Sequence, residues 1–276
     1  MRVVRIVLLV VTILILTVLT QVGGIVLLIT LGIWSLLRKQ IKKAWLRSVV
    51  PVVSGIGLYF IVAYLVIPPI ARSYGRMPLS MFEDGGLAPL TVWTCLLNRN
   101  YVRRELFDAA HDVAKKMVSR YPGTVVHYLD ASFPFLDKFP LLPHLSHNDG
   151  RKLDLSFHYL DRRTGAHTNE CPSFTGYGIC EEPRVGEEDM PAACAGKGYW
   201  QYNLVQSLTS QDRKSLFEFD RERTKSLVYY FSRETDISTI FIEPHLKKRL
   251  GLTSPKIKFH GCGAVRHDDH LHVQVY

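Results

Sequence analysis

The chain has 276 residues, of which 47% are hydrophobic and 21% are charged, and its formal net charge is +9. Seven of the basic residues lie within residues 1–70, which contain no Asp or Glu, so the rest of the chain carries 27 basic against 25 acidic residues. This balance excludes a basic nucleic-acid-binding face, because the excess charge flanks apolar segments.

Two uncharged stretches, residues 6–37 and 48–71, predict transmembrane helices. The second has 24 residues and would reach about 36 Å as a helix, enough for one tilted span across a hydrocarbon core of about 30 Å. The first has 32 residues, which leaves open one long span or a hairpin that turns at Gly23 and Gly24. We therefore expect residues 1–71 to form a membrane anchor of two or three spans.

Charge predicts the orientation of this anchor. Residues 38–47 carry five basic side chains, and Lys and Arg beside a span favour the cytoplasmic side. One further crossing would deliver residues 72–276 to the outside. A cleaved signal peptide over residues 1–20 is the alternative, but no small-residue cleavage site follows and hydrophobicity resumes at once.

Cysteine usage agrees with an oxidising exterior. All five cysteines follow the apolar segments, and none forms a CxxC pair of the structural-zinc kind. One or two disulfides with a thiol left over are expected, and the sequence leaves the pairing open. The cysteines are Cys95, Cys171, Cys180, Cys194 and Cys262.

After the apolar stretches, the sequence predicts a linker followed by a helix and a strand. Residues 72–91 contain several Pro and Gly and predict a linker between membrane and domain. Apolar residues at helical spacing predict a helix over 101–120, which Pro122 and Gly123 would end. Residues 124–130 (TVVHYLD) predict a strand that leads into a Pro-rich loop.

The remaining pattern favours an α+β domain over residues 92–276, with a small antiparallel sheet and flanking helices. Residues 152–159 (KLDLSFHY) alternate strictly between apolar and polar, which is typical of a half-buried strand. Residues 162–199, rich in Gly and Cys, predict a long surface excursion. The other expected elements are a helix at 221–232, a strand at 237–242, a helix at 244–250 and a strand at 270–276.

Two segments, 143–155 and 266–276, concentrate side chains that can bind a metal. In the second, strand alternation places His270 and His272 on one face and apolar residues on the other. In the first, His147 precedes a turn and Asp154 stands on the polar face of the following strand. Both segments therefore direct ligands towards one cleft.

A catalytic zinc site needs three nitrogen or oxygen ligands and an open position for water. His147, Asp154 and His272 would supply the ligands, with His270 beside the metal. His158 lies on the same strand face as Asp154 but about 13 Å along it, too far to join the same coordination sphere.

These segments resemble the penicillin-insensitive murein endopeptidases, zinc peptidases of a superfamily that also holds D-Ala-D-Ala carboxypeptidases, lysostaphin-type enzymes and the hedgehog signalling domain. The similar sequences occur in family order. DASFP at 130–134 looks like the family's DxSxP, HLSHNDGRKLD at 144–154 its HxxHxxGxxxD, and HDDHLHV at 267–273 its HDxHxHV. The intervening segments, including IFIEPHLKKRL at 240–250, are also similar.

The resemblance places zinc ligands on His147, Asp154 and His272, and the family's catalytic histidine on His270. Further active-site positions match as well. His144 and His267 fall on active-site histidines, and Asp130 and Ser132 on a motif that serves either substrate contact or loop stabilisation.

The resemblance thus implies a zinc metallopeptidase of the bacterial inner membrane. Its domain would lie on the periplasmic side and cleave D-amino-acid-containing peptide crosslinks of peptidoglycan. Two features depart from the family pattern. Gln274 replaces a basic residue, and the excursion 162–199 is longer than the corresponding segment of the family. The alternative is a non-catalytic zinc module that binds cell-wall peptide or a partner protein. A third reading, a membrane-anchored structural protein, would require both motifs to have arisen by chance.

Overall fold

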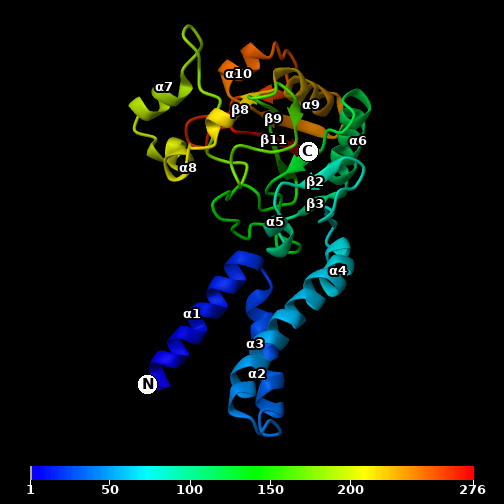
Figure 1. Ribbon diagram of the computed structural model, residues 1–276, viewed down its shortest axis with the longest axis vertical. Coiled ribbons are helices and arrows are strands. Elements are labelled where there is room, and N and C mark those ends of the chain that lie inside the picture. The colour runs from blue at the N-terminus through cyan, green and yellow to red at the C-terminus, as the bar shows by residue number, and fades with distance from the viewer. Residues whose placement is uncertain (1) are drawn as a thin grey trace.

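The computed structural model describes residues 2–276, which form an apolar helical region and a mixed α/β domain above it (Figure 1). The helical region begins with two helices that turn at residues 21–22, so the first apolar stretch forms a hairpin. The elements are α1 (Arg2–Thr20), α2 (Gly23–Leu37), α3 (Ala44–Ile61), the π-helical turn η1 (Val62–Val66) and α4 (Ile67–Ser73).

The hairpin depends on glycine at its turn. A Cβ added to Gly24 would lie 2.0 Å from Oγ1 of Thr17 on α1, so only glycine lets the two helices approach this closely. The last three helical elements run on as one helix, Ala44–Ser73, of 30 residues. This helix and Arg2–Thr20 are long and apolar enough to cross a membrane.

The centre of the domain is a six-stranded mixed sheet in the order β10-β9-β11-β5-β4-β2. Its two middle strands pair antiparallel with each other, whereas β10 with β9 and β2 with β4 pair parallel. The strands are β2 (Leu87–Pro89), β4 (Val126–Tyr128), β5 (Lys152–Ser156), β9 (Ile237–Phe241), β10 (Ile257–Lys258) and β11 (His270–Val275).

The expectation of one small antiparallel sheet was too simple. Two smaller antiparallel sheets accompany the central one, a two-stranded β1-β3 and a three-stranded β7-β6-β8. Their strands are β1 (Arg76–Pro78), β3 (Tyr101–Arg103), β6 (Tyr159–Asp161), β7 (His167–Thr168) and β8 (Phe217–Phe219). Residues 152–159 accordingly form two strands rather than one, because the chain leaves the central sheet after Ser156 and pairs with β8 from Tyr159 onwards.

The segment 72–91 is part of the folded domain rather than a linker. Two of the strands, β1 and β2, lie within it, and Arg76, Leu79 and Leu87 are buried. Its Pro and Gly residues mark the turns between short strands. Composition alone does not distinguish such turns from a flexible connection.

Helices cover one face of the central sheet and leave the other for polar residues. α6 (Arg104–Arg120) and α9 (Arg221–Arg233) share one apolar core with alternate residues of β5 and β11, as the helical spacing predicted. Leu153, Leu155, Leu271 and Val273 point into this core. Strand alternation therefore directs Asp154, His270 and His272 to the opposite face.

The excursion after β6 is ordered by short helices and a disulfide. Its elements are α7 (Met190–Gly196), η2 (Trp200–Asn203), α8 (Leu204–Leu208) and η3 (Lys214–Leu216). Cys194 on α7 pairs with Cys262, which tethers the excursion to the loop before β11. Among the described residues this is one disulfide, and Cys95, Cys171 and Cys180 are buried free thiols, so more thiols remain than expected. Two short helices complete the domain, α5 (Val92–Leu96) and α10 (Pro244–Arg249).

Candidate metal centre

The register of two central strands brings the polar side chains together. Asp154 on β5 lies directly opposite His272 on β11, and His270 lies opposite Ser156. Directly opposed residues of antiparallel strands share one face of the sheet. The predicted alternation and the observed pairing therefore place three polar groups side by side.

The loop before β5 adds His147. This loop turns at Gly150, whose φ is 75° and where an added Cβ would lie 2.8 Å from the buried Arg76 side chain. Glycine is required here because other residues rarely adopt this positive φ and because a Cβ would clash with the Arg76 side chain. The turn brings the loop back over the sheet, so that His147 faces Asp154.

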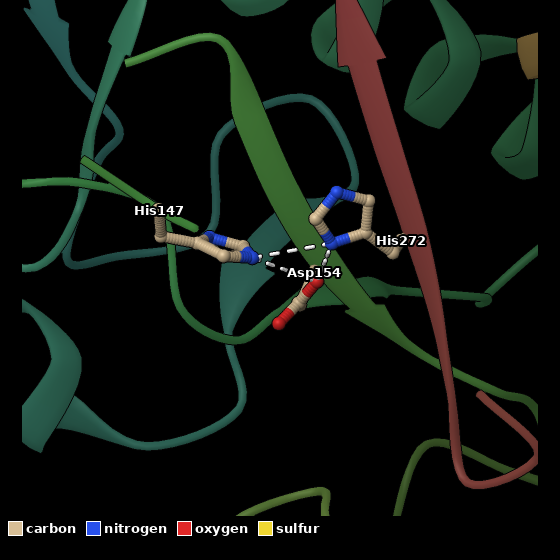
Figure 2. A group of neighbouring side chains, drawn as sticks. All are labelled: His147, Asp154 and His272. Carbon is tan, nitrogen blue, oxygen red and sulfur yellow. Dashed lines mark hydrogen bonds and ion pairs between the residues drawn. The ribbon is translucent and has the colours of Figure 1, made fainter. Parts of the chain in front are cut away.

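Figure 2 shows the three side chains converging. Nδ1 of His272 lies 2.8 Å from Oδ1 of Asp154, and Nε2 of His147 lies 3.2 Å from that Nδ1 and 3.3 Å from that Oδ1. All three residues are buried, and one candidate ligand atom from each lies within 4.8 Å of the others. The cluster could hold a metal ion.

The hydrogen bonds around the cluster leave lone pairs free to bind a cation. Nδ1 of His147 donates to the carbonyl of Ala131 at 2.9 Å, which leaves a lone pair on Nε2 facing the cluster. When both rings are neutral and Nδ1 of His147 carries its hydrogen, at most one hydrogen, on Nδ1 of His272, serves three atoms that can all accept. Two nitrogens and a carboxylate oxygen with lone pairs directed at one point are a donor set that a metal would satisfy.

Electrostatics keep two of the donors, Asp154 and His272, in the protonation states that a metal requires. Burial raises the pKa of Asp154, but the neighbouring His147 and His270 more than offset this, so its pKa lies well below its usual value. Burial lowers the pKa of His272 to about 4. The carboxylate is therefore ionised and His272 neutral at pH 7.

His270 lies beside the three ligands and is held by Asp269. Its Nδ1 donates to Oδ1 of Asp269 at 2.5 Å, and its Nε2 lies 3.7 Å from Oδ1 of Asp154. Burial lowers the pKa of His270, but Asp269 and Asp154 outweigh it and raise the pKa to about 9. Sequence reasoning did not single out Asp269, although it stands directly before His270 in the HDDHLHV segment.

Asp130 and His144 join the edge of the cluster, whereas Ser132 does not. Nδ1 of His144 lies 3.0 Å from Oδ2 of Asp130 and 3.7 Å from Oδ2 of Asp154. Arg99 donates to the same Asp130 oxygen at 2.6 Å. Oγ of Ser132 instead accepts a hydrogen bond from the buried Arg76 at 2.8 Å, a contact that anchors the loop.

His267 packs against the site, and His158 lies away from it. The ring centroid of His267 is 4.9 Å from that of His270 and 5.6 Å from that of His272. Burial lowers the pKa of His267 well below its usual value, so it is neutral. The backbone N–H of His158, which follows the end of β5, donates to Oγ1 of Thr224 on α9, and its side chain does not join the cluster, as expected.

Tyr177, from the long excursion, also reaches the site. Its hydroxyl donates to Oδ2 of Asp154 at 2.9 Å, and its ring centroid lies 4.5 Å from that of His144 and 4.9 Å from that of His270. No sequence pattern marks Tyr177, because its approach depends on how the excursion folds back.

A cavity of about 350 Å³ borders this edge of the site. Asp130, His144 and Tyr177 line it on the side of the cluster, and Trp93 and Phe174 line it further out. The last two side chains are 55% and 66% exposed, so the cavity opens to the surface beside α5.

No protein-family model matches the chain, and no curated protein is significantly similar to it in sequence. The fold and the site thus define a mixed α/β domain with a buried His, Asp and His cluster that could hold a metal, preceded by apolar helices that could span a membrane.

Proposed function

We propose that this protein is a membrane-anchored zinc metallopeptidase that hydrolyses peptide crosslinks of peptidoglycan at a D-amino-acid-containing bond. One observation carries the proposal. Ligand atoms from His147, Asp154 and His272 converge, with Nε2 of His270 directed at the same point and its Nδ1 held by Asp269. The resemblance to the murein endopeptidases supports the substrate class.

His147, Asp154 and His272 would hold the metal, because two imidazoles and one carboxylate are a ligand set that catalytic zinc sites use. When bound, zinc polarises a carbonyl group and lowers the pKa of water from 15.7 towards about 7. Tyr177 would keep the Asp154 carboxylate oriented through its hydrogen bond to Oδ2.

His270 would handle the proton at Nε2. Asp269 fixes the hydrogen on Nδ1, so Nε2 is the only ring atom free to exchange a proton with substrate. The Asp269 carboxylate, hydrogen-bonded to Nδ1, favours the protonated ring, which would donate a hydrogen bond to the oxygen of the scissile carbonyl as negative charge develops on it. As the C–N bond breaks, the same atom would deliver its proton to the leaving nitrogen, which departs as an amine.

The cavity beside the cluster would receive the peptide. It runs from His144 and Asp130 to the exposed Trp93 on α5, and α5 lies at the end of the domain nearest to α1 (Figure 1). A cavity that opens on this side favours substrate within reach of the membrane.

The proposed orientation places residues 38–43 in the cytoplasm and the domain in the periplasm. The start of α1 and the loop between α2 and α3 lie at the same end of the helical region, and the domain lies at the other end (Figure 1). Protease added to cells with a permeabilised outer envelope and an intact inner membrane should digest the domain and leave a protected fragment. A domain that stays protected until the inner membrane is broken would lie in the cytoplasm, away from cell wall.

A second function, a non-catalytic zinc module, is favoured by the burial of the cluster. His147, Asp154 and His272 are 2%, 1% and 3% exposed, and structural zinc sites are closed to water. The Asp269–His270 pair favours the peptidase, because binding alone requires no group held ready for proton exchange.

The test uses the full-length protein, purified in detergent, loaded with zinc and incubated with crosslinked muropeptides. Mass spectrometry should detect new uncrosslinked products from the wild type and from His167→Ala, which removes a half-exposed histidine outside the cluster. His270→Ala should yield almost none. A wild type that is fully loaded with zinc and leaves every crosslink intact would favour the binding module.

A further inference from the structure

A second cavity, of about 450 Å³, lies where the membrane helix meets the domain. The long helix contributes Ala63, Tyr64 and Pro68 to its wall, and the segment after β1 contributes Leu79 and Phe82. No charged side chain lines it. Its size falls within the range of about 300–1,000 Å³ that is usual for ligand cavities.

The depth of this cavity follows from the helix. Arg47 is the last basic residue before the uncharged run, and Ala63 and Pro68 follow it by 16 and 21 residues. At 1.5 Å per residue these positions lie about 24 and about 32 Å above Arg47. The hydrocarbon core is about 30 Å thick, so the cavity lies across its outer boundary, where acyl chains meet the headgroups.

The local helix geometry creates the cavity. Ala63 and Tyr64 belong to the π-helical turn η1, and such turns are frequent at functional sites. Ala63 has only a methyl group. It leaves space beside Tyr64, which lines the cavity and is 38% exposed. Aromatic residues at this depth are typical of the membrane–water interface.

The walls are held by contacts between the helices and the domain. The hydroxyl of Tyr59 donates to the carbonyl of Leu96 at 2.6 Å, and Nδ2 of Asn98 donates to the carbonyl of Thr20 at 3.2 Å. Ile67 and Ala71 are buried in an apolar cluster with Tyr101 of the domain. The cavity is therefore part of a packed junction.

The chemistry of the lining identifies the occupant. Nδ2 of Asn100 already donates to the carbonyl of Leu79 at 2.6 Å, and Oγ of Ser80 accepts from the backbone N–H of Phe82 at 3.1 Å. These polar groups have partners within the protein, and there is no charge to bind an anion or a peptide terminus. Phe82 is 77% exposed beside the opening and offers further apolar surface.

We infer that this cavity binds an acyl chain of a membrane phospholipid, which fills the junction and fixes the domain against the bilayer surface. The inference rests on the proposed membrane placement and not on the peptidase activity. Burying the chain against Tyr64, Leu79 and Phe82 would stabilise the junction in proportion to the apolar area removed from water and headgroups.

The test reconstitutes the full-length protein in phosphatidylcholine vesicles that contain a trace of phosphatidylcholine with a photoactivatable group in one acyl chain. After irradiation, mass spectrometry should find adducts on Tyr64, Met81 or Phe82, besides those on the lipid-facing helices. Ser80→Phe fills the cavity and should lower adducts at these residues by about tenfold, the effect of about 1.4 kcal/mol. Thr253→Phe, in a cavity beside α9, should leave them unchanged.

Three results would overturn the inference. The first is a set of adducts confined to α1, α2 and α3. The second is undiminished labelling at Phe82 in a Ser80→Phe protein with normal metal content. The third is loss of labelling on adding muropeptides, which would assign the cavity to substrate. A chain that is labelled nowhere would refute the membrane placement as well. Muropeptide cleavage is measured separately, so failure of the peptidase proposal is distinguishable from failure of this one.

Discussion

Two clusters of buried charge lie in the same domain and differ in how their hydrogen bonds are satisfied. Arg223 on α9 is 1% exposed, yet each of its side-chain nitrogens donates to an oxygen. Nε donates to Oδ2 of Asp220 at 2.6 Å. The other acceptors are Oγ1 of Thr124 and the carbonyls of Tyr159 and Thr168.

The cluster around Asp154 has the opposite property. When both rings are neutral, its carboxylate Oδ1 and the inward nitrogens of His147 and His272 are three potential acceptors with at most one hydrogen among them. A buried charge whose partners are complete belongs to the scaffold, whereas acceptors that converge without donors mark a place for a cation. We therefore expect changes in the Arg223 cluster to alter stability and changes in the Asp154 cluster to alter metal content.

The largest effect should follow removal of a ligand. The zinc-loaded wild type should contain about one zinc per chain, and His147→Ala or His272→Ala should contain almost none, because each leaves only two protein ligands. Elemental analysis of the purified full-length protein measures this. His158→Ala, a buried histidine on the same run of chain as Asp154, is the matched control and should retain its zinc. Full zinc in either ligand variant would refute the assignment.

Removing the proton-exchanging group should leave the metal and stop most of the turnover. His270→Ala should keep its zinc and lose about 10²-fold or more in muropeptide cleavage. Asp269→Asn should lose about 10- to 100-fold, because the ring would no longer be held with Nε2 towards the cluster. Cleavage rates and zinc content are measured on the same samples. Loss of zinc from His270→Ala would make His270 a ligand instead.

The Arg223 cluster should respond in stability rather than metal content. Arg223→Met leaves the buried Asp220 without its guanidinium partner and should lower the free energy of unfolding by about 3–5 kcal/mol. Denaturant unfolding in detergent gives this difference, and zinc stoichiometry below the transition should be unchanged. Arg221→Met, on the exposed side of the same helix, should cost less than about 1 kcal/mol. Loss of zinc without loss of stability would show that Arg223 supports the metal site and not the scaffold.

The smallest effect on stability is expected at the partly exposed ion pair between Glu187 and Arg249. Hydrogen bonds from Arg249 lower the pKa of Glu187 to about 2, against a usual value of 4.5. A depressed carboxylate pKa stabilises the fold above the usual value and loses this contribution as the pH falls towards 2. Glu187→Gln should therefore cost about 1 kcal/mol at pH 7 and almost nothing at pH 2. Melting temperatures of the wild type and of Glu187→Gln between pH 2 and pH 7 measure this difference. A difference that does not change with pH would contradict the ion pair.

Several features could be predicted from the sequence because they depend on local spacing. Strand alternation in 270–275 and around Asp154 separates core from polar residues, and the helices at 104–120 and 221–233 follow from apolar periodicity. The apolar helices follow from the absence of charge over residues 6–37 and 48–71. The candidate metal ligands His147, Asp154 and His272 could also be predicted, because two short motifs contain them all.

Other features were decided only by the tertiary structure. Residues 76–89 lie in the domain because β2 pairs with β4, a pairing that their Pro-rich and Gly-rich composition does not encode. Tyr177 reaches Asp154 across 23 residues, and the disulfide joins positions 68 residues apart. The cavity between the long apolar helix and the domain exists only where the two pack together. In each case the partner is distant along the chain, and local pattern specifies which face a side chain occupies but not what packs against it.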